Sequence, residues 1–109
     1  MGTRLSKRFE DALVYATRLH ASQTRKGTDI PYVSHLLAVA SLVIEAGGTE
    51  DEAIAALLHD GPEEDQGGLP TLKQIRDRFG LPVGKIVAAC SDTFEQKETG
   101  LAPAQAGLP

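Results

Sequence analysis

The sequence has few features that would cross-link the chain or anchor it in a membrane. Its 109 residues include one cysteine, Cys90, so a disulfide within the chain is impossible, and we expect Cys90 to be a small buried apolar residue. No apolar run approaches the roughly 20 residues that span a bilayer. Residues 1–8 are basic and polar and lack the apolar stretch of a secretory signal. These absences predict a cytoplasmic protein with no membrane partner.

An excess of positive charge is also missing. The net charge of −4 argues against binding to a nucleic-acid polymer, because such binding requires the neutralisation of many phosphates. The charges are unevenly distributed: residues 1–26 carry six basic and two acidic side chains, whereas residues 27–109 carry five basic and thirteen acidic ones. A basic N-terminal part beside an acidic centre would suit a small phosphorylated ligand held next to a metal ion.

Strand-like alternation, internal repeats and low-complexity tracts are absent as well. Apolar residues instead recur at helical spacing, as Phe9, Leu13 and Ala16 do in the first segment. This spacing predicts an all-α fold, a bundle of about five helices. The expected helices are one over 6–23, one capped by Ser34 and ended by Gly47-Gly48, one with a capping box that begins at Thr49 and an end at His59-Asp60, one capped by Thr71 that runs through Phe79, and one that Pro82 opens and that runs through about Cys90.

The C-terminal part of the chain has a different character. A chain of this length has room for one core, and its apolar periodicity ends near Glu95. The remaining residues are rich in glycine, alanine and proline. We therefore predict one domain over residues 1–95 and an irregular tail over residues 96–109.

Two histidines and an aspartate stand at the ends of the most apolar segments. His59-Asp60 ends one such helix, and His35 lies 24 positions upstream near the start of another. A histidine at a helix end can also serve the helix dipole, but a second buried imidazole without a partner would be costly. Two imidazoles and a carboxylate satisfy one another best around a divalent metal ion. We therefore predict that His35, His59 and Asp60 are metal ligands.

Charged residues near this set allow two interpretations each. The acidic run Glu63, Glu64 and Asp65 is either a solvated loop or a source of carboxylates for proton transfer. The basic pair Arg25 and Lys26 is either a solvated turn or a phosphate clamp.

A third histidine, His20, continues the apolar face of the first helix. It is expected to be a core histidine bonded to the backbone or to a neighbouring acid, with a supporting role near the metal as the alternative.

These residues, in this order, resemble the HD metal-dependent phosphohydrolases, and within them the hydrolase domain of the RelA/SpoT alarmone proteins and the small alarmone hydrolases. The resemblance runs from about Phe9 to Phe94 and rests on His20 to Thr28, Pro31-Tyr32-Val33-Ser34-His35, Leu57-Leu58-His59-Asp60, Glu64-Asp65, Phe79-Gly80 and Ser91-Asp92-Thr93. It implies an HD-type hydrolase domain that removes the 3′-pyrophosphate from guanosine tetra- or pentaphosphate, with Mn²⁺ or another divalent metal as cofactor.

The resemblance also implies roles for individual residues. His35, His59 and Asp60 would hold the metal, Arg25 and Lys26 would contact the guanosine nucleotide, and a Glu-Asp pair would handle the water or the leaving group. That pair is Glu64-Asp65, or Glu63-Glu64 in the other register.

The family's fourth ligand is an aspartate on a later helix, beyond the last residue of this chain. We therefore expect a chain truncated relative to the family, with a homo-oligomer covering exposed apolar surface. The alternatives to the alarmone hydrolase are a catalytically impaired HD fragment and an HD nucleotidase with another nucleotide substrate.

Overall fold

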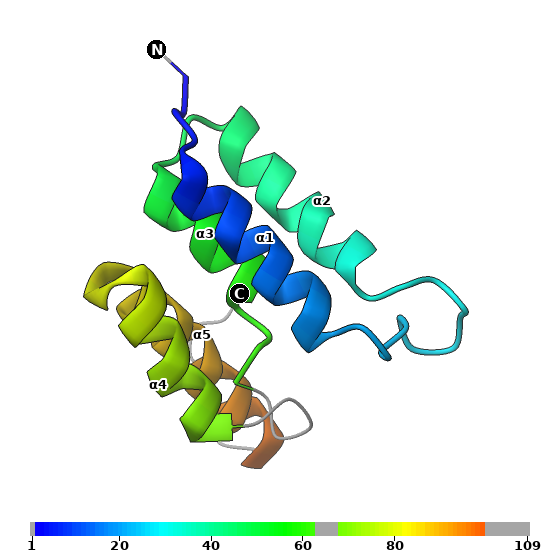
Figure 1. Cartoon of the computed structure of the whole chain (residues 1–109). Coiled ribbons are helices and arrows are strands. Elements are labelled where there is room, and N and C mark those ends of the chain that lie inside the picture. Colours follow the sequence, from blue (N-terminus) through cyan, green and yellow to red (C-terminus); the bar gives the residue numbers. More distant parts are fainter. Residues whose placement is uncertain (1, 63–67, 100–109) are drawn as a thin grey trace.

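The computed structural model describes residues 2–62 and 68–99, and this part of the chain folds into five helices (Figure 1). They are α1 (Lys7–Leu19), α2 (Val33–Glu45), α3 (Glu50–Leu58), α4 (Gly68–Phe79) and α5 (Leu81–Thr99). The only β-type pairing among the described residues is an isolated antiparallel bridge between Thr24 and Pro31. The predicted all-α fold is confirmed.

Helix α3 forms the centre of the bundle. Every residue from Ala53 to Leu58 is buried, so the helix must be covered on all sides. It packs against α1, α2 and α5. Figure 1 shows α1 passing in front of α3, with α2 on one side of it and the α4–α5 pair on the other. The nearly uninterrupted apolar sequence of α3 therefore places its last residues inside the domain.

The start of α3 is fixed by the predicted capping box. The Thr49 hydroxyl accepts a hydrogen bond from the backbone N–H of Glu52 at 3.1 Å, and the Glu52 carboxylate accepts one from the backbone N–H of Thr49 at 2.8 Å. Gly47, with a φ of 84°, supplies the left-handed conformation that ends α2 just before this cap. The short turn between α2 and α3 follows from these local signals.

Removal of this cap is expected to destabilise the domain measurably. Thr49→Ala leaves the N–H of Glu52 without its side-chain partner and should lower the free energy of unfolding by about 1 kcal/mol. The matched control is Thr17→Ala, because the exposed Thr17 hydroxyl only bonds to the carbonyl of Leu13 in its own helix. Urea unfolding measures both variants. An equal loss in both would contradict a specific role for the cap.

Two helix boundaries in the first half of the chain differ from the predictions. Helix α1 ends at Leu19, where His20 forms the C-cap, and not near residue 23. Helix α2 begins at Val33, so Ser34 lies inside its first turn; the N-cap is Tyr32, which makes no side-chain capping bond. Since Ser34 N–H bonds to the carbonyl of Pro31 at 3.0 Å, the first turn of the helix already includes Ser34, and its N-cap lies two residues before the predicted one.

The second half of the chain contains two further corrections. Helix α4 begins at Gly68, so Thr71 is a buried residue inside the helix and not its cap. Pro70 is compatible with this because the first turn of a helix needs no N–H from proline. Helix α5 continues to Thr99, beyond the predicted helix end near Cys90, since residues such as Glu95, Gln96 and Lys97 are good helix formers. Residues 100–109 of the predicted tail lie outside the described residues.

Cys90 is exposed and not buried as the sequence suggested. Helix α5 buries Val83 and Val87 in the core, and Cys90 lies past these two positions.

Among the described helices, none is both long enough and apolar enough to cross a membrane.

Candidate metal centre

The two predicted histidine ligands and the aspartate converge at one point between α2 and the end of α3. One ligand atom from each of His35, His59 and Asp60 lies within 4.8 Å of the others. The His59 Nε2 atom is 3.2 Å and the His35 Nε2 atom 3.6 Å from Asp60 Oδ2, and the two imidazole rings are 5.8 Å apart. The fold therefore brings His35 beside His59 and Asp60, which lie 24 and 25 positions further along the sequence.

The end of α3 orients His59 for this arrangement. The His59 Nδ1 atom lies 2.7 Å from the carbonyl oxygen of Ala56, one turn back on the same helix. The Nδ1–H donates to this carbonyl, so Nε2 faces Asp60 Oδ2, where it donates a hydrogen bond when the ring is protonated and offers a lone pair to a cation when the ring is neutral. This is the backbone support that metal-binding histidines commonly have.

The chain turns tightly after Asp60, and the close packing of this turn favours a residue without a side chain. Gly61 N–H donates to the carbonyl of Leu58 at 2.9 Å. A Cβ at Gly61 would lie 3.1 Å from both the Leu58 carbonyl and Leu19 Cδ2. Because the backbone approaches α1 so closely, Gly61 fixes where Asp60 sits against the core.

Electrostatics favour the forms of Asp60 and His35 that bind a cation. Burial opposes ionisation of Asp60, but hydrogen bonds from His59 and Tyr32 and the charges of the two histidines outweigh it and lower the Asp60 pKa to about 2. Burial also lowers the pKa of His35; Arg25 contributes in the same direction, while the Asp60 charge opposes it. At neutral pH the carboxylate is therefore charged and the His35 imidazole neutral, as metal coordination requires.

The donor set fits a divalent transition-metal ion. Two imidazole nitrogens and a carboxylate oxygen suit first-row ions such as Mn²⁺, Fe²⁺ or Zn²⁺ better than the all-oxygen sites that Ca²⁺ prefers. The three side chains are only 15–28% exposed, so the site is largely shielded while one side remains open to solvent. A ligand role for His35, His59 and Asp60 agrees with this geometry.

The basic pair lies in the loop between α1 and α2. Arg25 N–H donates to the carbonyl of Ile30 at 2.8 Å, and Thr28 N–H donates to the carbonyl of Arg25 at 2.9 Å, which folds the loop back on itself. Both Arg25 and Lys26 are exposed. The charge of Arg25 lowers the pKa of His35, so Arg25 acts electrostatically on the candidate metal centre. The predicted catalytic residues Glu63, Glu64 and Asp65 lie outside the described residues.

His20 is buried as predicted, with 3% of its surface exposed, but its partner is different. Its Nδ1 atom lies 2.7 Å from the side-chain oxygen of Gln23, neither a backbone group nor an acid. The ring of His20 packs against that of Tyr32, with 5.1 Å between the ring centroids. The ring of His20 therefore contacts Tyr32, whose hydroxyl in turn bonds to Asp60 in the cluster.

Tyr32 is a residue at the centre to which the sequence analysis gave no role. Its hydroxyl donates a hydrogen bond to Asp60 Oδ2 at 2.5 Å. The signal was present in the sequence, because Tyr32 and His35 are three positions apart at a helix start and so share one face.

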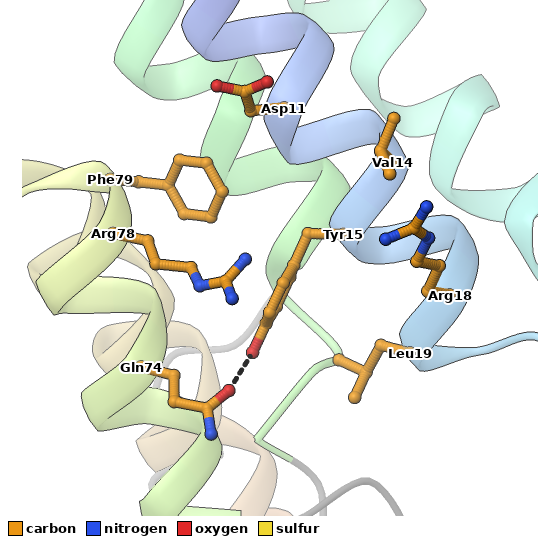
Figure 2. Close-up of a pocket in the computed structure, with 8 residues that line it drawn as sticks. All are labelled: Asp11, Val14, Tyr15, Arg18, Leu19, Gln74, Arg78 and Phe79. Atoms are coloured by element: carbon orange, nitrogen blue, oxygen red, sulfur yellow. Dashed lines mark hydrogen bonds between the residues drawn. The ribbon is translucent and has the colours of Figure 1, made fainter.

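A pocket of about 670 Å³ lies elsewhere, between α1 and α4 (Figure 2). Figure 2 shows Tyr15 in its wall, with the Tyr15 hydroxyl bonded to Gln74 Oε1 at 3.0 Å and the Arg78 guanidinium 5.1 Å from the ring centroid. None of His35, His59 and Asp60 lines this pocket. We therefore place the candidate site at the His/Asp cluster, where the three predicted ligands meet.

The chain is an all-α domain in which a His-Asp pair follows the central helix and lies beside a histidine from a neighbouring helix. The family model of the HD domain matches residues 12–106, and the chain belongs to the HD-domain family. The predicted resemblance is thus confirmed.

Three similar proteins have names in the alarmone group. A probable GTP pyrophosphokinase of Mycobacterium leprae is 43% identical over 76 residues, which cover 70% of this chain and 9% of that protein. A guanosine-3′,5′-bis(diphosphate) 3′-pyrophosphohydrolase of Aquifex aeolicus is 38% identical over 82 residues, 75% of this chain and 11% of that protein. A protein of the same enzymatic name from Xenopus tropicalis is 36% identical over 85 residues, 75% of this chain and 46% of that protein. The chain thus spans less than half of each of these relatives.

Proposed function

We propose that this domain is a divalent-metal-dependent phosphohydrolase that removes the 3′-pyrophosphate from guanosine tetra- or pentaphosphate. The observation that carries the proposal is the convergence of His35, His59 and Asp60 within 4.8 Å at the end of the central helix. The names of the Aquifex and Xenopus relatives supply the substrate class. Mn²⁺ is the proposed ion, in agreement with the mixed nitrogen and oxygen donors.

Each proposed role follows from the chemistry of the side chain. His35, His59 and Asp60 would hold the ion, which when bound lowers the pKa of water and neutralises phosphate oxygens. The substrate carries several phosphate groups, so cations beside the centre are required to hold it. Arg25 and Lys26 would meet that requirement, since both are exposed and the charge of Arg25 reaches His35.

The proton transfers need a carboxylate that is not occupied by the ion. Glu64 and Asp65 are proposed for the orientation of the attacking water or the protonation of the leaving group, with Glu63 and Glu64 as the alternative register. All three follow Asp60 within five positions. Cytoplasmic location and a homo-oligomeric state stay predictions.

The test is the release of pyrophosphate by the purified chain. With guanosine tetraphosphate and Mn²⁺ we expect release that stops after dialysis against EDTA and returns when Mn²⁺ is added back. GTP and deoxynucleoside triphosphates are assayed beside it, because preferential cleavage of either would favour the HD nucleotidase. A folded protein that binds Mn²⁺ and releases no pyrophosphate would contradict the proposal and favour the impaired fragment.

A further inference from the structure

We propose that Tyr32 is a positioning residue that joins the candidate metal centre to the basic loop at residues 24–31. The proposal rests on the proposed function and deepens it. The side chain of Tyr32 holds the Asp60 carboxylate, while its backbone closes the loop that carries Arg25 and Lys26. Through this one residue, the geometry of the ion site and that of the nucleotide-binding loop depend on each other.

The first step is the contact with Asp60. The Tyr32 hydroxyl lies 2.5 Å from Asp60 Oδ2, and the Asp60 side chain is only 15% exposed. A hydrogen bond to a charged carboxylate is stronger than one between neutral groups, and solvent exclusion strengthens it further. An ionised carboxylate has about four acceptor positions on its two oxygens, so Asp60 can accept from Tyr32 and still offer an oxygen to a cation.

The second step is the restraint on the tyrosine ring. The ring centroid of His20 lies 5.1 Å from that of Tyr32, and the ring centroid of His35 lies 5.4 Å from it. His20 is buried and held in turn by Gln23. Contact with two imidazoles restrains the rotation of the Tyr32 ring, so its hydroxyl is already directed at Asp60 before any ligand binds.

The third step is the backbone. Tyr32 N–H donates to the carbonyl of Gln23 at 2.9 Å, and beside this bond Thr24 and Pro31 form the isolated antiparallel bridge. The next bond along the loop, from Arg25 N–H to the carbonyl of Ile30, measures 2.8 Å. Tyr32 therefore closes the base of the loop with its main chain while its side chain reaches the centre.

The experiment compares the two tyrosines of the chain. Tyr32→Phe removes the hydroxyl at Asp60, whereas the control Tyr15→Phe removes a hydroxyl that bonds to Gln74 in the other pocket. Electron paramagnetic resonance measures the Kd for Mn²⁺, and thermal unfolding without metal measures the fold. We expect Tyr32→Phe to weaken Mn²⁺ binding by about tenfold or more, as loss of a group that orients a ligand commonly does. The control should keep the wild-type Kd within about twofold.

Hydrogen exchange tests the connection to the loop. Addition of Mn²⁺ should slow amide exchange in residues 24–31 of the wild type and the control, and should slow it much less in Tyr32→Phe at equal saturation with metal.

The outcomes separate the two proposals. If the wild type binds Mn²⁺ and Tyr32→Phe binds it equally well, Tyr32 has no positioning role, and the metal centre stands without it. A lower melting temperature with an unchanged Kd would reveal a purely structural residue and would overturn the inference in the same way. If the wild type itself binds no Mn²⁺, both the metal centre and the role of Tyr32 are wrong.

Discussion

Replacement of Asp60 by asparagine is expected to lower metal-dependent pyrophosphate release by about a thousandfold, which corresponds to roughly 4 kcal/mol of transition-state stabilisation. Among the described residues, Asp60 is the one carboxylate of the cluster, and the Nε2 atoms of both histidines lie within 3.6 Å of its Oδ2 atom. Its depressed pKa, about 2, means that the side chain carries its charge throughout the neutral range. Asparagine has nearly the same shape, so the substitution removes the charge and leaves the volume of the side chain unchanged.

Initial rates with saturating Mn²⁺ and the Kd for Mn²⁺ are the two measurements. The control is Asp11→Asn, because Asp11 is an exposed aspartate paired with Lys7 at 2.9 Å on the surface of α1. Circular dichroism should show both variants folded. Retention of more than about a tenth of the wild-type rate in Asp60→Asn would count against the His/Asp cluster as the reaction centre.

Replacement of Leu57 by alanine is expected to cost about 3 kcal/mol of unfolding free energy. Leu57 is fully buried in α3, the helix against which α1, α2 and α5 pack. Truncation would leave a cavity in a place where three neighbouring helices cannot all move inward. The free energy of unfolding of an ordinary domain is roughly 5–15 kcal/mol, so this loss would be a large part of the total stability.

Urea unfolding provides the measurement, with Leu42→Ala as the matched control. The same three carbons are removed from Leu42, but this side chain lies on α2 with 67% of its surface exposed. Its replacement should change the unfolding free energy by less than about 0.5 kcal/mol. Similar effects in the two variants would mean that α3 is not the centre of the core.

Local signals predicted the elements that depend on short-range contacts. The capping box at Thr49, the end of α2 at Gly47 and the central place of α3 are all present. Each depends on backbone conformations or hydrogen bonds within four residues, or on the apolar content of one segment. The starts of α2 and α4 were placed wrongly, because both helices begin before the residues that the sequence offered as caps, so Ser34 and Thr71 lie inside the first turns.

The partners of the buried side chains required the tertiary structure. The sequence indicated a metal site from His35, His59 and Asp60, but not how close they lie. Nothing in the sequence indicated that His20 would bond to Gln23, or that Cys90 would be exposed at the end of the core. Such contacts depend on where each helix ends and how it is rotated, and an error of one residue at a helix end turns the next side chain by about 100°.

The sequence by itself determined that the chain is all-α and which residue types can bind a cation, because helical periodicity and donor chemistry are properties of local composition. Only the tertiary structure decided that those donors meet, and that Tyr32 reaches Asp60 across 28 positions of sequence. The physical reason is that the packing of α2 on α3 sets the distance between them, and this packing is the sum of many weak apolar contacts spread over both helices.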